Sequence, residues 1–210
     1  MSNPDDPTPA DSLISKEDGL KYWEGISADV NGMLGGIPAN GRHKVINALE
    51  GGAGIGRVTE GLLLPIAEQV DVVEPVAKFT AALQTKPGVR TVFNVGLQDW
   101  RPTEDVRYDL IWVQWCAGHL TDKQLVEFLG RCQEVLNPEG IIVIKENQST
   151  KGYDVFDEED SSVTREDTKF RSLFEQANLK LVATEPQRGF PEKGTIRLLP
   201  VRMYALKPMA

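Results

Sequence analysis

The sequence is poor in the residues that build disulfide frameworks, metal centres and membrane spans. It contains two cysteines and two histidines among 210 residues. Cys116 and Cys132 are too few for a disulfide framework and lack the spacing of metal ligands, which favours a reducing compartment. No apolar stretch approaches the length that crosses a bilayer, and the acidic, proline-rich start does not resemble a signal peptide. We therefore expect an intracellular protein, cytoplasmic and also nuclear, without a bound metal or a membrane partner.

Positive charge is scarce as well. Lysine and arginine number 23 against 31 aspartates and glutamates, which gives a net charge of -8 and a pI near 4.9. The field of such a protein repels a phosphate polyanion. The composition therefore argues against a nucleic-acid partner and favours a cationic or a small neutral substrate.

The length fits one domain with a single buried core, so residues 1–210 are predicted to form one domain. Residues 1–14 combine prolines with Asp, Ser and Thr, a composition that cannot build a core, and we expect a disordered leader there. Ser15 can then cap a helix that a glycine pair ends. We predict that residues 15–36 form a helical lid over a ligand; packing of Trp23 against the core is the alternative.

A glycine-rich turn lies between two short apolar runs. The run over residues 45–49 leads into the turn GGAGIG over residues 51–56, helical spacing continues to Ile66, and a second apolar run ends on Glu74. Glycines permit positive φ and close approach of a ligand, and an acid after the second strand can accept hydrogen bonds from a ribose diol. This order predicts the first half of a nucleotide-binding α/β unit. A tight turn without a ligand is the alternative.

An acidic residue, Glu50, comes directly before the turn. It would repel a pyrophosphate but suits a ligand that carries an amine. The turn E/D-x-G-x-G-x-G resembles motif I of the S-adenosylmethionine (SAM) methyltransferases, and Glu74 falls where these enzymes carry their ribose-binding acid. The resemblance implies that SAM is the cofactor.

The rest of the chain alternates between further strands and helices. Helices are expected over residues 76–85, 121–136 and 164–177, and strands after the first two over residues 90–95, 108–113, 141–144, 179–184 and 196–206. The last two strands are expected to form a closing hairpin. The predicted fold class is α/β, a Rossmann-like class I SAM-dependent methyltransferase. Its seven-stranded sheet would be mostly parallel with an antiparallel last strand, preceded by the N-terminal helical extension.

Several side chains that could contact a ligand follow the expected strands at their carboxyl ends. They are Leu97 and Gln98 after the third strand, Gln114, Trp115 and His119 after the fourth, Asn147 after the fifth, and Asp157, Asp160, Ser161 and Ser162 in the loop beyond. Because the carboxyl ends of parallel strands meet at one edge, we expect these side chains to converge above the cofactor. Histidine suits proton transfer at neutral pH, although a lone histidine is more often structural. The acidic run is either a solvated face or a pocket for a cationic substrate.

The segments over residues 114–120 and 157–162 resemble a known family more specifically than the glycine turn does. The elements Q-W-x-x-G-H-L and D-x-x-D-S-S are similar to those of the protein α-N-terminal methyltransferases, which methylate the free α-amine of chains beginning Xaa-Pro-Lys or Xaa-Pro-Arg. The similarity extends roughly from Tyr22 to Leu206. It implies that the partners are protein or peptide N-termini, for example those of ribosomal proteins.

The resemblance also implies roles for individual residues. The cofactor would be bound by Gly52, Arg57, Glu74, Leu97, Gln98 and Gln114. The peptide would be bound by Trp23, Leu34, Gly35, Trp115, Asn147, Asp157, Asp160 and Ser162. Asp160 and His119 would be the catalytic residues, which take a proton from the α-amine.

This chain departs from the family pattern in two places. Glu74 stands where the family often has Asp, and the last strand is poorer in tyrosine and contains Pro200. We therefore assign no substrate contact to the C-terminal strand. Two other readings stay open: a SAM-dependent methyltransferase of a small-molecule amine or a lysine side chain, and a non-catalytic binding module with the same sheet.

Overall fold

The structure is a computed structural model that describes residues 45–103, 105–188 and 199–209. The leader expected over residues 1–14 and the lid over residues 15–36, with Trp23, Leu34 and Gly35, lie outside these residues. Their structure therefore stays a prediction, as do the domain boundaries. Within the described residues, no helix is long and apolar enough to cross a membrane.

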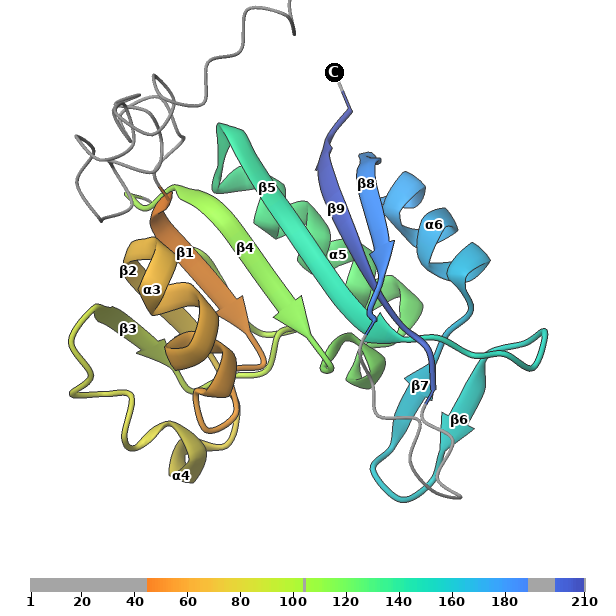
Figure 1. Cartoon of the computed structure of the whole chain (residues 1–210), viewed down its shortest axis with the longest axis horizontal. Coiled ribbons are helices and arrows are strands. Elements are labelled where there is room, and N and C mark those ends of the chain that lie inside the picture. Colours follow the sequence, from red (N-terminus) through yellow and green to blue (C-terminus); the bar gives the residue numbers. More distant parts are fainter. Residues whose placement is uncertain (1–44, 104, 189–198, 210) are drawn as a thin grey trace, which may run out of the picture. The chain divides into compact units, whose positions relative to one another are not determined.

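Seven strands of the described chain form one sheet (Figure 1). They are β1 (Val45–Gly51), β2 (Ala67–Val73), β3 (Val89–Phe93), β4 (Tyr108–Gln114), β5 (Leu136–Asn147), β8 (Leu179–Pro186) and β9 (Val201–Pro208). Their order across the sheet is β3-β2-β1-β4-β5-β9-β8. The pairs among the first five strands are parallel, and β9 runs antiparallel to both β5 and β8. The predicted mostly parallel sheet with an antiparallel last strand is confirmed.

The strand order reverses between β1 and β4, which opens a crevice at the carboxyl ends of the strands. Gly51 at the end of β1 lies opposite Val73 in β2 and Val113 in β4. The three strands therefore end level with one another. The segments that follow them meet at this edge, where an open α/β sheet binds its ligand.

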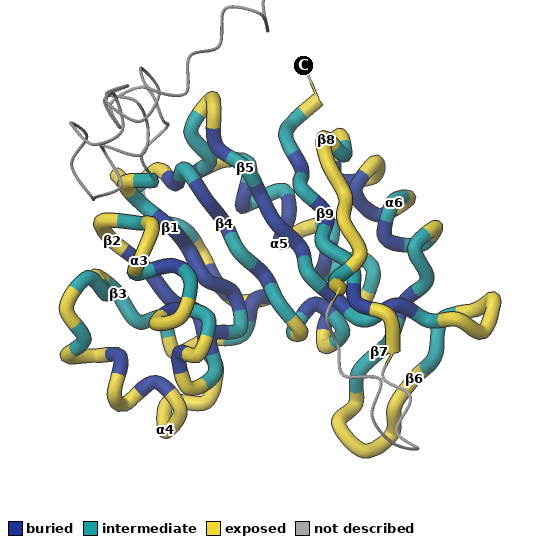
Figure 2. Tube along the Cα trace, viewed as in Figure 1, coloured by how far each residue is buried: buried dark blue, intermediate teal, exposed yellow. Residues whose placement is uncertain are grey.

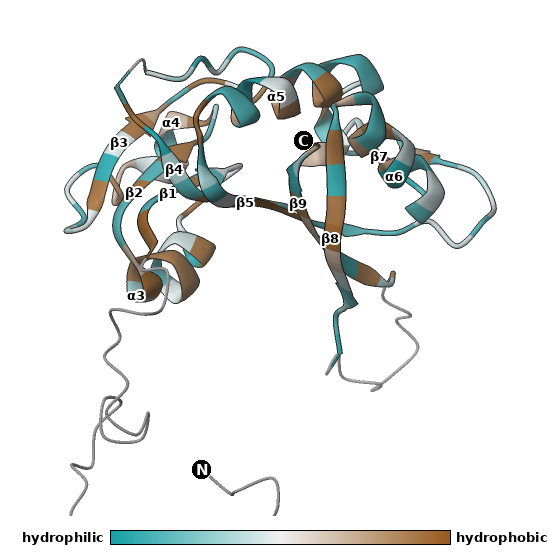
Figure 3. Cartoon of the chain, turned by 90° about the horizontal axis from the view of Figure 1, so that it is seen from above, coloured by the Kyte–Doolittle hydropathy of each residue, from teal (hydrophilic) through white to brown (hydrophobic). Residues whose placement is uncertain are grey.

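Helices cover both faces of the sheet. They are η3 (Thr59–Leu63), α3 (Leu64–Ile66), α4 (Ala77–Thr80), η4 (Ala117–His119), α5 (Asp122–Glu134) and α6 (Asp167–Gln176). Figure 3 shows α5 and α6 on one side of the sheet and α3 on the other. Alternate residues of β1 face two different cores, because Leu49 belongs to the apolar cluster under α5 and Ala48 to the cluster that contains Leu63. Figure 2 shows the central strands buried, whereas β8 at the edge is exposed.

Most of the expected helices form, and one is shorter than predicted. The helix after the glycine turn runs over residues 57–66 and ends at Ile66 as predicted, with π-type hydrogen bonding in its middle. The helix expected over residues 76–85 contains only the short α4, and turns follow it. Within residues 81–85 only Leu83 is buried, so this segment has too little apolar packing to sustain a longer helix.

The predicted cap of α5 is present. Thr121 Oγ1 accepts a hydrogen bond from the backbone N–H of Gln124 at 3.3 Å. In return, Gln124 Oε1 accepts the backbone N–H of Thr121 at 2.9 Å. This capping box satisfies two N–H groups that the helix itself leaves free, and it starts α5 where the sequence indicated.

A small hairpin replaces the loop expected between β5 and α6. Its strands β6 (Val155–Asp157) and β7 (Ser162–Thr164) pair antiparallel. The helix predicted from Thr164 therefore begins only at Asp167. The acidic run over residues 157–160 lies at the tip of this hairpin, where β6 ends and the turn to β7 follows.

The C-terminal strand contributes a tyrosine to the core. Tyr204 is fully buried, packs on Phe170 and Phe174 of α6, and donates a hydrogen bond from its hydroxyl to Asp167 Oδ1 at 2.9 Å. The strand begins at Val201, directly after Pro200, which cannot donate to the ladder. Tyr204 thus supports the fold and is not exposed at the surface.

An ion pair between the buried Asp71 of β2 and the partly exposed Arg90 of β3 provides a test of the packing. Asp71 is 1% exposed and accepts hydrogen bonds from Arg90 Nε at 3.0 Å and from the Tyr108 hydroxyl at 2.6 Å. Asp71→Asn weakens these hydrogen bonds and removes the counter-charge of Arg90, which stays partly solvated, so we expect the unfolding free energy to fall by roughly 2 kcal/mol in urea titration. Glu60→Gln, which removes the exposed pair with Lys86, is the control and should cost less than about 1 kcal/mol. Equal losses in the two variants would contradict this role of the buried network.

Candidate active site

The glycine turn brings the end of β1 into contact with the end of β4. Gly52 has a φ of +71°, and its N–H donates to the carbonyl of Val73 at 2.8 Å. A Cβ at this position would collide with the side chain of Cys116, whose thiol donates to the carbonyl of Gly51 at 3.1 Å. Position 52 therefore requires glycine for its backbone conformation and for space.

Glu74 is fixed by backbone groups on both sides of it. The residue is 7% exposed; its Oε2 accepts the N–H of Gly54 and its Oε1 accepts the N–H of Val76, both at 2.9 Å. Asn94 donates to the carbonyl of Glu74 at 3.1 Å. Each carboxylate oxygen keeps acceptor capacity for a further hydrogen bond. A pair of vicinal hydroxyls is the ligand group that such a carboxylate suits.

A large cavity of about 860 Å³ opens above the carboxyl ends of the first strands. Six of its lining residues are ones that the sequence predicts to contact the cofactor or the substrate or to act in catalysis: Gly52, Glu74, Leu97, Gln98, Trp115 and His119. Three exposed apolar side chains, Val76, Phe79 and Val95, also line it. Exposed apolar side chains gathered in a concave site are typical of a pocket that takes a planar, partly apolar ligand.

A smaller cavity of about 190 Å³ adjoins the large one. Five of its lining residues are ones that the sequence predicts to bind the substrate or to act in catalysis: Trp115, His119, Asn147, Asp160 and Ser162. They come from the ends of β4, β5 and β7, which are far apart in the sequence. Trp115 and His119 line both cavities. A ligand in the large cavity and a ligand in the small one can therefore meet beside these two side chains.

Three other predicted site residues do not line either cavity. Arg57 holds its guanidinium carbon 5.2 Å from the ring centroid of Trp115. Gln114 accepts a hydrogen bond from Trp112 Nε1 at 3.2 Å. Asp157 accepts the backbone N–H of Glu159 at 2.9 Å and so supports the tip of the hairpin. Gln98 lines the large cavity, but its amide donates to Asp99 at 3.0 Å.

Glu146 is a buried acid that sequence reasoning missed. One of its oxygens, Oε1, accepts the backbone N–H groups of Cys116 and Ala117, each at 2.8 Å. Burial raises the pKa of Glu146 to about 7, although these hydrogen bonds oppose the increase. In the sequence, only its position next to Asn147, a predicted substrate contact, indicated that Glu146 belongs to the site. Glu146 lines the small cavity and also holds the backbone that follows Trp115.

Glu50 is a second buried acid, at the end of β1. It is 2% exposed, and the hydroxyl of Thr59 donates to its Oε2. Burial raises the pKa of Glu50 from 4.5 to about 7; the Thr59 hydrogen bond opposes this, and the negative charge of Glu74 adds to it. Among the described residues, no group of three or more His, Cys, Asp or Glu side chains is arranged to hold a metal ion.

Four features together define a class I SAM-dependent methyltransferase. They are the order of the strands, the crevice where that order reverses, the glycine turn and the acid after β2. The cofactor of this protein is SAM. The large cavity fits that molecule, because its volume lies in the range of small-ligand sites and it combines an apolar lining with the carboxylate of Glu74.

Comparison with known proteins identifies the family. The family described as AdoMet dependent proline di-methyltransferase matches residues 37–207, and the chain belongs to it. Alpha N-terminal protein methyltransferase 1 of Schizosaccharomyces pombe is 44% identical over 216 residues, which cover 91% of this chain and 95% of the relative. N-terminal Xaa-Pro-Lys N-methyltransferase 1 of Xenopus tropicalis is 42% identical over 199 residues, which cover 82% of this chain and 88% of the relative.

A solved structure supports the same family. A SAM-dependent methyltransferase of Leishmania major is 33% identical, with a TM-score of 0.70, and the match covers 91% of this chain and 82% of that protein. The N-methyltransferase NodS of Bradyrhizobium japonicum, 16% identical with a TM-score of 0.61 over 79% of this chain and 87% of that one, shares the fold. The family, the fold class and the cofactor predicted from the sequence are thus confirmed.

The raised pKa of Glu50 leads to a test by pH. Between its unfolded pKa of 4.5 and its folded pKa of about 7, the native state binds a proton that the unfolded state has lost. The unfolding free energy must therefore fall as the pH rises through this window. Glu50→Gln removes this contribution, so we expect the decrease between pH 5 and pH 8 to shrink by roughly 2 kcal/mol in urea titrations.

The matched control for this test is Glu60→Gln, an exposed acid on the following helix. It should leave the pH dependence close to that of the unmodified protein. Glu146 contributes with the same sign and persists in both variants, so some decrease with pH should remain. An unchanged pH dependence in Glu50→Gln would refute the assignment.

Proposed function

We propose that this protein transfers methyl groups from SAM to the free α-amine of protein chains that begin Xaa-Pro-Lys or Xaa-Pro-Arg. The observation that carries the proposal is the pair of adjoining cavities that share Trp115 and His119. The names of its relatives support it, since one of them is an N-terminal Xaa-Pro-Lys N-methyltransferase. Ribosomal proteins with such N-termini are the proposed partners.

The large cavity would hold the cofactor. Glu74 would accept hydrogen bonds from the ribose hydroxyls, and Gly52 would let the backbone approach the methionine part. Leu97 and Gln98 would frame the adenine. Arg57 would pair with the methionyl carboxylate, and Gln114 would contact the methionyl amine or carboxylate. When bound, SAM supplies a methyl group on a sulfonium, which a neutral amine can attack.

The small cavity would hold the first residues of the substrate chain. Trp115 would pack on the second-position proline, which is apolar and rigid, and Asn147 would donate to the first carbonyl. Asp160 and Ser162, with the negative charge of Asp157 nearby on the hairpin, would receive the third-position cation. Trp23, Leu34 and Gly35, which lie outside the described residues, would close over the peptide.

Asp160 and His119 would accept the proton that the α-ammonium must lose before its lone pair can attack. This step is easier for an α-amine, with a pKa of about 8, than for a lysine side chain, with a pKa of about 10.4; the difference is roughly 3 kcal/mol at neutral pH. A modest base therefore suffices. Each further methyl transfer needs a neutral amine again, so the same two residues would act repeatedly.

The compartment we propose is the cytoplasm together with the nucleus. Cys116 and Cys132 are both free thiols, which fits a reducing environment. Unblocked protein N-termini would be accessible to the enzyme in both compartments.

The proposal predicts a strict requirement for an unblocked N-terminus. We expect a peptide that begins Ser-Pro-Lys to gain methyl groups in the presence of SAM, as measured by intact mass, and the same peptide with an acetylated N-terminus to gain none. A peptide that begins Ser-Gly-Lys tests the proline contact with Trp115 and should react much more slowly. Methylation of the acetylated peptide would instead favour a lysine side chain as the acceptor.

A substitution at the proposed base separates chemistry from cofactor binding. Asp160→Asn should lower kcat/KM for the Ser-Pro-Lys peptide by on the order of 10²-fold or more, because it removes an acceptor of the α-ammonium proton. Its SAM affinity, measured by calorimetry, should stay near that of the unmodified protein. The control is Glu158→Gln, an exposed acid at the same hairpin tip, which should react normally. A collapse of SAM affinity in Asp160→Asn would place Asp160 in the cofactor site instead.

A further inference from the structure

The segment from Trp115 to Leu120 separates the two cavities, so its position decides how they meet. Glu146 holds the start of the segment through the backbone N–H groups of Cys116 and Ala117. The end of the segment contains η4 and His119. It is held from a different side, by Arg165.

Arg165 lies between β7 and α6 and is 1% exposed. Its Nη1 donates to the carbonyl of Ala117 at 3.0 Å, and its Nη2 donates to the carbonyl of Leu120 at 2.5 Å. These two carbonyls flank His119. One guanidinium therefore spans the turn that presents His119 to both cavities.

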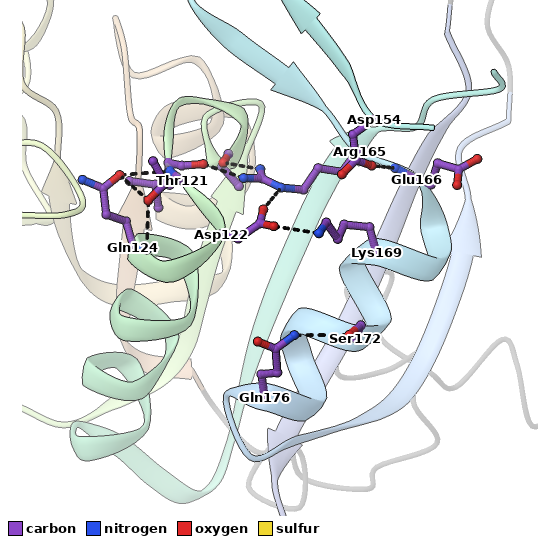
Figure 4. Close-up of polar contacts among 11 residues, drawn as sticks. Thr121, Asp122, Gln124, Asp154, Arg165, Glu166, Lys169, Ser172 and Gln176 are labelled. Carbon is purple, nitrogen blue, oxygen red and sulfur yellow. Dashed lines mark hydrogen bonds and ion pairs between the residues drawn. The ribbon is translucent and has the colours of Figure 1, made fainter. Parts of the chain in front are cut away.

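A third contact fixes the guanidinium itself. Its Nε donates to Asp122 Oδ1 at 3.0 Å, and the other oxygen of Asp122 pairs with Lys169 Nζ at 2.7 Å. Figure 4 shows this chain of contacts from α5 across to α6. The guanidinium thus has a partner on each of its three nitrogens. A lysine ammonium is a single point charge and cannot reach three acceptors in this fan-shaped arrangement.

The backbone directly before Arg165 forms the opposite wall of the small cavity. Ser162, Val163 and Thr164 of β7 line that cavity together with Asp160. An added Cβ on Gly118 would lie 3.1 Å from the carbonyl oxygen of Val163, so η4 and β7 are in close contact. Arg165 therefore joins the strand that follows Asp160 to the turn that contains His119.

We propose that Arg165 is a positioning residue for methyl transfer: by holding η4 against β7, it keeps His119 and Asp160 on the same cavity at the spacing that the substrate amine needs. This inference rests on the proposed function and deepens it. Arg165 does not line either cavity, so it acts through His119 and the hairpin and not by touching a ligand. Displacement of a reacting group by about 1 Å can lower a rate by on the order of 10²-fold.

Arg165→Lys tests the inference, with Arg171→Lys as the matched control. Arg171 is a partly exposed arginine on α6 whose Nε donates to Asp167 at 2.8 Å, away from both cavities. In Arg165→Lys, kcat/KM for the Ser-Pro-Lys peptide should fall by on the order of 10²-fold, mostly through kcat. The SAM dissociation constant should change by less than about threefold, because Glu74 and the glycine turn are untouched. Arg171→Lys should match the unmodified protein in both measurements.

A second variant keeps the test decisive if Arg165→Lys does not fold. Asp122→Asn retains the arginine but weakens the ion pair that orients it, so we expect a smaller fall in kcat/KM, of about tenfold, with SAM affinity maintained. The pH profile of kcat/KM should shift in either variant, because the surroundings of the proton acceptors change. A purely structural arginine would lower the melting temperature without moving that profile.

The outcomes distinguish the inference from the function on which it rests. If the unmodified protein does not methylate the peptide, the proposed function fails. If the unmodified protein is active and Arg165→Lys is as active as Arg171→Lys, the positioning role is overturned. A parallel loss of SAM affinity and peptide turnover in Arg165→Lys also overturns it, and so does an unchanged kcat/KM in Asp122→Asn when Arg165→Lys fails to fold.

Discussion

The backbone N–H groups of Cys116 and Ala117 converge on one oxygen of Glu146, and this contact joins the chain leaving β4 to the end of β5. Trp115, directly before them, has a φ of +54°, a conformation that is costly for a side chain of this size. The hydrogen bonds to Glu146 and the donation from the Trp115 N–H to the Lys145 carbonyl, at 3.1 Å, hold the chain there. Without these hydrogen bonds, the segment from Trp115 to Leu120, which separates the two cavities, would not be held in one position.

Charged side chains surround Trp115. The cations of Arg57 and Lys145 lie 5.2 and 5.6 Å from the centroid of its ring. Burial, and then repulsion from Arg57, lower the pKa of Lys145. The small cavity, which Trp115 also lines, contains the acids Glu146 and Asp160. Cations beside Trp115 suit a ligand that carries a carboxylate, and Asp160 suits a ligand that carries a cation.

Features with a local cause could be predicted from the sequence. The glycine turn, Glu74 and the capping box of Thr121 and Gln124 depend on residues close together in the chain, and the periodic apolar runs indicated the sheet. The residues that line the small cavity could be predicted from their positions at the ends of strands and from the resemblance to the family. Glu146 and Arg165 were missed because most of their partners are backbone groups and all of those named above lie 29 or more residues away, so the sequence pattern does not reveal them. The hairpin of β6 and β7 was missed because each strand has only three residues.

The contact between Gly52 and Cys116 makes two distant positions depend on each other. The thiol fills the space that a side chain at position 52 would need, and it donates to Gly51, 65 residues earlier in the chain. A smaller residue at position 116 would leave a gap behind the cofactor turn, and a larger one would push that turn outward. The shape of the glycine loop therefore depends on the chain that follows β4. A smaller residue at position 116 would not make room for a side chain at position 52, because the φ of +71° there still favours glycine.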